Sequence, residues 1–100
     1  MASNMIKLIN PDPAKQGATI QVEKYDTIRA AILQALRAHG RLTYEQIARD
    51  VEQQLAGNFE GSIRWYVTAV KLDLEGKHVL ERVKEKGREY VQLAQEKQPQ

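Results

Sequence analysis

The sequence predicts a mainly α-helical fold with a small β-hairpin, contained in one domain. Three successive stretches place apolar residues at the three- and four-residue spacing of an amphipathic helix. After the third stretch the period changes to two, and β-prone residues flank a charged turn that contains a glycine. One hundred residues supply one modest core. We therefore expect an N-terminal arm over residues 1–21, a folded domain over 22–94 and a polar tail over 95–100.

The composition excludes several classes of protein. Apolar residues make up 42% and charged residues 28% of the chain, as in globular domains. Cysteine is absent, so neither disulfides nor thiolate metal sites can form. The first residues lack the pattern of a secretory signal, and no apolar run reaches the ~18 residues of a membrane span. We expect a cytoplasmic protein without a membrane partner.

The arm contains a short apolar piece at residues 5–9, followed by Pro11 and Pro13. Two prolines so close together exclude a regular helix. The apolar piece is open to three interpretations: a short strand, a plug that packs on the domain, or part of a loosely ordered terminus.

A first helix is predicted from residue 22 or 23 to about residue 38. Its buried stripe follows the spacing i, i+3, i+4, i+7, i+8 and consists of Ile28, Ala31, Ile32, Ala35 and Leu36, with Tyr25 one turn earlier. Glu23 near its start and Arg37 near its end suit the helix dipole. Gly40 can adopt the left-handed conformation that ends a helix.

A second helix is predicted to begin at a capping box. Thr43 can accept a hydrogen bond from the first turn, and the side chain of Gln46, three residues later, can reach back to accept one from the Thr43 amide. Leu42 and Ile47 occupy the two positions of a hydrophobic staple beside it. Phe59, in the loop that follows this helix, is expected to pack into the core.

The third predicted helix, residues 61–76, is apolar over most of its circumference, unlike a surface helix with one buried stripe. Its core line consists of Ile63, Val67, Val70 and Leu74. The flank expected to face solvent carries Arg64, Thr68, Lys71 and Glu75. Opposite the core line lie Trp65, Ala69 and Leu72. This opposite face needs a cover, which is either the arm of the same chain or a second subunit.

Two β-prone runs, residues 79–83 and 88–93, flank a charged turn at 84–87 and predict a hairpin. A helix over residues 86–97 is the alternative, because Tyr90, Val91 and Ala94 also fit helical spacing. The glycine in the turn and the Val and Tyr residues around it favour the hairpin.

Three helices, a short strand near Leu42 and a final hairpin follow the order of a winged helix-turn-helix, three helices plus a wing. Residues 62–75, SIRWYVTAVKLDLE, followed by Glu81, Arg82 and Val83, resemble a small bacterial winged-helix family of uncharacterised function. The chain is also loosely similar to the N-terminal winged-helix domains of Mrr-type restriction proteins. The resemblance covers about residues 24–83 and implies the fold rather than an activity. Its pattern has a glycine where this chain has His78.

The first functional hypothesis is binding of double-stranded DNA, as by a transcriptional regulator, with the third helix in the major groove and the wing on the backbone. The candidate contacts are Ser62, Arg64, Thr68 and Lys71 on the helix and Lys84, Lys86 and Arg88 in the wing. Arg64 can bind a guanine edge, and lysines suit phosphates. The alternative is that these side chains are merely solvated. Residues 57–76 carry two basic and three acidic side chains, so a monomer should bind weakly.

The second hypothesis is a protein interaction or assembly module that does not bind DNA. It rests on the face formed by Trp65, Ala69 and Leu72 and on the apolar piece of the arm, because exposed apolar patches mark interfaces. A homodimer through this face is one form of it.

An enzyme is not expected. His39 and His78 lie at predicted helix ends and lack patterned carboxylates, so they do not predict a metal site. Neither Ser3 nor Ser62 belongs to a nucleophile motif, and no glycine-rich phosphate loop or other cofactor signature is present. Asp73, within the apolar arc of the third helix, is expected to pair with a basic group or a backbone amide.

Overall fold

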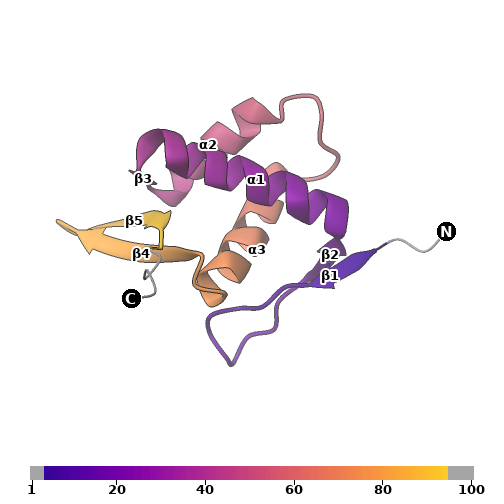
Figure 1. The fold of residues 1–100 in the computed structure, drawn as a ribbon, viewed down its shortest axis with the longest axis horizontal. Coiled ribbons are helices and arrows are strands. Elements are labelled where there is room, and N and C mark those ends of the chain that lie inside the picture. The colour runs from indigo at the N-terminus through magenta and orange to yellow at the C-terminus, as the bar shows by residue number, and fades with distance from the viewer. Residues whose placement is uncertain (1–3, 95–100) are drawn as a thin grey trace, which may run out of the picture.

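The computed structural model of the chain describes residues 4–94, which form three helices and two small antiparallel sheets (Figure 1). The helices are α1 (Val22–His39), α2 (Tyr44–Gln54) and α3 (Ile63–Gly76); the strands are β1 (Met5–Lys7), β2 (Thr19–Gln21), β3 (Arg41–Leu42), β4 (Leu80–Glu85) and β5 (Arg88–Leu93). Helices hold 47% and strands 22% of these residues, so the fold is mixed α/β rather than mainly α. The predicted tail, 95–100, lies outside the described residues.

The larger sheet has the strand order β3-β5-β4. Strands β4 and β5 pair from Leu80 opposite Leu93 to Glu85 opposite Arg88, so the predicted hairpin is confirmed and the helix over 86–97 is wrong within its described part. The turn has Lys86 at a φ of 52° and Gly87 at 77°. Two consecutive positive φ values are those of the two-residue turn that matches strand twist.

The predicted helix ends are confirmed. Helix α1 ends at Gly40, which has a φ of 83°. Thr43 and Gln46 form the capping box of α2. The Gln46 amide donates to the Thr43 hydroxyl at 3.2 Å, and the Thr43 amide donates to the Gln46 side chain at 2.9 Å. Beyond α3 the chain turns through His78, which has a φ of 63°. A glycine would adopt this conformation without strain.

The core lies where the three helices meet, and α3 passes beneath α1 (Figure 1). Its fully buried members include Ile28, Ile32, Leu36, Ile47, Val51, Val67, Val70 and Leu74. These residues are the stripes that helical spacing predicts. Phe59 packs at the edge of this core, half-buried, with its ring 5.1 Å from that of Tyr66 in an edge-to-face contact.

The arm is an ordered hairpin whose strands β1 and β2 pair at the opposite end of the molecule from β4 and β5 (Figure 1). Leu8, directly after β1, is only 2% exposed, and Ile20 in β2 is 4% exposed. Both belong to the same core as the helices. The apolar piece 5–9 is therefore a strand that continues into a plug. The pairing of this strand with β2 forms the second, two-stranded sheet.

Gly17 lies where the two halves of the arm approach most closely. A Cβ at this position would stand 2.0 Å from the carbonyl oxygen of Leu8 and 2.5 Å from its carbonyl carbon. We expect Gly17→Ala to lower the free energy of unfolding by about 2 kcal/mol, because the arm backbone must move apart to admit the methyl group. Urea denaturation measures the change. Gln16→Ala, at the exposed neighbour, is the control and should stay within about 0.5 kcal/mol of wild type; equal stability of both variants would contradict the prediction.

Candidate functional site

The candidate site comprises α3 and the β4–β5 hairpin, which adjoin in the fold. Ser62 is the N-cap of α3, and its hydroxyl accepts a hydrogen bond of 3.2 Å from the Trp65 amide. Thr68, one turn after Arg64, is exposed. Its hydroxyl lies 2.8 Å from the Tyr44 hydroxyl and donates to the Arg64 carbonyl at 3.0 Å. Both predicted polar contacts of α3 thus reach solvent while they also serve the helix.

Arg64 is held by two carboxylates from α2. Its terminal nitrogens donate to Glu45 at 2.9 Å each, and its Nε and one terminal nitrogen donate to Glu52 at 3.1 and 3.2 Å. The hydrogen bonds from Arg64 lower the pKa of Glu45 to about 2. Sequence reasoning missed both carboxylates, because they lie 19 and 12 residues before Arg64 on another helix.

Lys71 is not on a solvated flank, which corrects the sequence-based expectation. It is 8% exposed, and its ammonium lies 2.8 Å from the carboxylate of Glu75, one turn later and equally buried. Arg82 reaches across from β4 and donates to the same carboxylate at 2.8 and 3.0 Å. Only the C-terminal half of the flank, Lys71 and Glu75, is buried, where β4 packs against α3. Burial disfavours the charged form of Glu75, yet the bonds from Arg82 and Lys71 prevail and lower its pKa.

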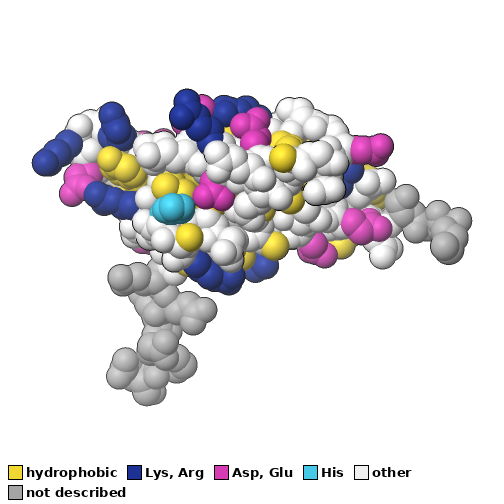
Figure 2. Space-filling view, turned by 90° about the horizontal axis from the view of Figure 1, so that it is seen from above, with side chains coloured by type: hydrophobic (Ala, Val, Ile, Leu, Met, Phe, Trp, Pro, Cys, Tyr) yellow, Lys and Arg dark blue, Asp and Glu magenta, His cyan; other side chains and the backbone are white. Residues whose placement is uncertain are grey.

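The hairpin brings the three predicted wing cations together. Lys84, Lys86 and Arg88 are all exposed within one turn and its flanking strand ends. Among residues 4–94, no carboxylate lies within salt-bridge distance of these three side chains. Figure 2 shows Lys and Arg side chains gathered at this end of the molecule, with Asp and Glu side chains between them. The nearby Arg41 pairs with Glu85 and lies 4.5 Å over the Tyr90 ring.

The apolar face of α3 is covered in part by the arm of the same chain. A hollow of about 160 Å³ lies between them, lined by Ile9, Asn10, Gln16, Gly17 and Ala18 of the arm and Trp65, Thr68, Ala69 and Leu72 of α3. Ala69 and Leu72 are half-buried, whereas Trp65 is 50% exposed and the neighbouring Ile9 43%. The arm therefore covers the C-terminal part of this face and leaves the tryptophan open.

Asp73 is fully buried and paired, as its position in the apolar arc predicts. It accepts hydrogen bonds from the Ile9 amide at 2.9 Å and from the Tyr25 hydroxyl at 2.7 Å, and it forms an ion pair of 2.9 Å with Lys77. Burial and the bond to Asp73 raise the pKa of Tyr25. Because both oxygens of this carboxylate have structural partners, Asp73 is part of the scaffold of the site.

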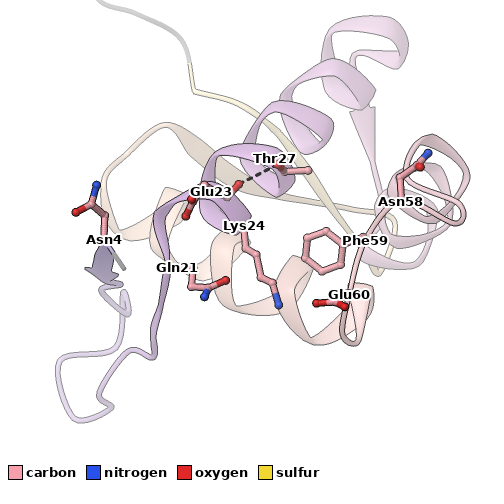
Figure 3. A pocket seen from close by; sticks show the side chains of 8 residues that line it. All are labelled: Asn4, Gln21, Glu23, Lys24, Thr27, Asn58, Phe59 and Glu60. Atoms are coloured by element: carbon pink, nitrogen blue, oxygen red, sulfur yellow. Dashed lines mark hydrogen bonds between the residues drawn. The ribbon is translucent and has the colours of Figure 1, made fainter. Parts of the chain in front are cut away.

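A second hollow, of about 430 Å³, lies among β2, the start of α1 and the loop before α3. Lys24 points between Gln21 and Glu60, with its ammonium 5.6 Å from the Phe59 ring centre (Figure 3). Thr27 donates to the Glu23 carbonyl at 2.8 Å on the rim. The lining mixes both signs of charge, and the one ammonium already contacts aromatic rings, so the hollow does not define a ligand.

Residues 4–94 contain no group of three or more His, Asp or Glu side chains arranged to hold a metal ion. Within the same residues, no helix combines the length and the apolar character that a membrane crossing requires.

Comparison with known protein families shows a match over most of the chain. A family model described as a family of unknown function (DUF6958) matches residues 5–90. Neither a curated protein nor a solved structure matches the chain. The resemblance to winged-helix and Mrr-type domains stays a prediction.

The Lys71–Glu75 pair yields a stability prediction. Glu75→Gln should lower the free energy of unfolding by about 3 kcal/mol, because it leaves a buried ammonium without its carboxylate. The double variant Lys71→Met, Glu75→Gln should recover most of this loss, since the uncompensated charge is removed as well. Thermal and urea unfolding measure both. Glu89→Gln, which removes an exposed partner of Arg82 at 3.7 Å, is the control and should cost less than about 0.5 kcal/mol; a double variant as unstable as the single one would contradict the explanation.

Proposed function

The chain belongs to this family of unknown function, and we propose that it is a winged-helix protein that binds double-stranded DNA, with a regulatory rather than a catalytic role. In this proposal α3 faces the major groove and the β4–β5 hairpin is a wing on the phosphate backbone. The observation that carries it is the cluster of Lys84, Lys86 and Arg88, three exposed cations without carboxylate partners among the described residues.

The order of elements supports the same proposal. The succession α1, β3, α2, α3, β4 and β5, with the sheet order β3-β5-β4, is the succession expected of a winged helix-turn-helix. The hairpin that carries the three cations packs against α3 through β4. Phosphate contacts from lysine and arginine give affinity that does not depend on sequence.

The helix itself has little charge to offer to DNA. Arg64 is bound by two carboxylates and Lys71 is buried, so only Ser62 and Thr68 of the predicted helix contacts are open polar groups. Binding should therefore be weak, dependent on salt and only slightly selective for sequence. Three phosphate contacts correspond to a slope of about −2.7 in a plot of log affinity against log salt concentration.

A pair of charge-matched variants tests the DNA proposal. Lys84→Gln, Lys86→Gln removes two wing cations, and Lys7→Gln, Lys15→Gln removes two exposed cations of the arm. In fluorescence anisotropy with a 20-base-pair duplex, the wing variant should bind more weakly and its salt slope should shrink by about 1.8. The arm variant should keep the wild-type affinity and slope. Equal losses in both variants, or no wild-type binding at 50 mM salt and tens of micromolar protein, would count against the wing.

A second candidate function, assembly into a homodimer, is favoured by the open part of the apolar face. Trp65 and Ile9 are both large, exposed and beside the same hollow. In a two-fold dimer the same patch of each subunit meets its copy, so one exposed tryptophan supplies both halves of the contact. Such a dimer would also double the phosphate contacts made by the wings.

Sedimentation measures the assembly directly. Wild type at high concentration should sediment as a dimer, and Trp65→Ala should sediment as a monomer with an unchanged far-ultraviolet circular dichroism spectrum. Met5→Ala is the control, because Met5 is equally exposed, at 52%, and does not line the hollow beside α3. A wild-type protein that stays monomeric at every concentration would exclude this homodimer.

A further inference from the structure

The guanidinium of Arg64 is occupied along two of its edges. The two terminal nitrogens bind the two oxygens of Glu45, at 2.9 Å each, in a fork-to-fork arrangement. The Nε and one terminal nitrogen bind the two oxygens of Glu52, at 3.1 and 3.2 Å, in a second fork. Paired donors of this kind are what an arginine uses to bind the O6 and N7 atoms of a guanine. Both pairs are already used within the protein.

The arrangement persists across the physiological pH range. Arg64 is the first cause that holds the pKa of Glu45 at about 2, and Arg49 adds a further hydrogen bond of 3.1 Å. Glu45 is therefore ionised at every pH at which the protein would meet DNA. Arg49 and Arg64 balance the charges of Glu45 and Glu52, so this cluster offers no net positive charge to attract a phosphate.

We propose that Glu45 and Glu52 are specificity-determining residues that withhold Arg64 from DNA. With Arg64 bound, the domain contacts the phosphate backbone through its wing and does not select guanine through α3. Removal of the two carboxylate charges exposes the guanidinium at the start of α3, where a recognition helix contacts base edges. This inference rests on the proposed DNA binding, and it assigns to α2 a function that the winged-helix order alone does not.

Four proteins test the inference: wild type, R64A, the double variant E45Q/E52Q and the triple variant E45Q/E52Q/R64A. Glutamine keeps the shape of glutamate, and the double and triple variants share the same loss of negative charge. Any difference between these two therefore comes from Arg64 alone. Their affinities are measured by fluorescence anisotropy on duplexes with and without guanine runs, and preferred sites are selected from a randomised duplex pool.

Wild type and R64A should bind with the same affinity, within about two-fold. The reason is that the guanidinium of wild-type Arg64 is occupied by Glu45 and Glu52 and does not contact DNA. The double variant should bind guanine-containing duplexes at least about ten-fold more tightly than the triple variant, since a bidentate arginine contact contributes about that factor. Only the double variant should select guanine from the pool. A gain seen in the double variant but not in wild type supports the inference even where wild-type binding is undetectable.

Two results overturn the inference. One is a ten-fold loss of affinity in R64A, which would show that Arg64 already contacts DNA. The other is equal binding by the double and triple variants. If wild type binds through its wing and either result occurs, the inference fails while the proposed function stands; if none of the four proteins binds, both fail. Circular dichroism and thermal unfolding monitor the fold of each variant. If the double variant does not fold, the single variants E45Q and E52Q replace it. Each releases one pair of Arg64 donors, so the expected gain in affinity is smaller.

Discussion

The fold depends on one buried carboxylate. Asp73, fully buried near the end of α3, binds the Ile9 amide of the arm, the Tyr25 hydroxyl of α1 and the Lys77 ammonium just after α3. A buried charge of this kind is tolerated only when each of its oxygens is paired. The three partners come from three separate segments, so the carboxylate is satisfied only when the arm, α1 and α3 are all in place. The position of the arm beside α3, and with it the partial cover of the apolar face, follows from this one requirement.

The other charged side chains of α3 are paired within the protein. Lys71 and Glu75 are buried against β4 with Arg82, and Arg64 is bound to the two carboxylates of α2. These ion pairs fix α3 between α2 on one side and the larger sheet on the other. Of the cations that α3 and the β4–β5 hairpin carry, Lys84, Lys86 and Arg88 are the ones that are exposed and have no carboxylate partner among the described residues. A side chain at the surface of α3 therefore cannot be equated with one that is free to bind a ligand.

Local signals predicted the local parts of the structure. The capping box of α2, the stripes of α1 and α3 and the hairpin turn at Gly87 depend on residues a few positions apart, which periodicity and turn chemistry detect. The pairing of β1 with β2, the partners of Arg64 and two of the three partners of Asp73 depend on contacts 12 to 64 residues apart, which no single-element pattern records. For that reason the sequence predicted a mainly α fold, placed Lys71 in solvent and missed Glu45 and Glu52. The cover that it required for the apolar face of α3 is present over Ala69 and Leu72 but not over Trp65.

The bond between Ile9 and Asp73 also bears on how the chain matures during synthesis. Ile9 is translated first, and its carboxylate partner follows 64 residues later. At 5 to 20 residues per second, a ribosome needs about 3 to 13 s to bridge that interval. Within that interval α1 is synthesised, but α3 is not complete, so the Ile9 amide lacks its carboxylate partner. The bond that holds the arm to α3 therefore forms only after most of the described chain has been made.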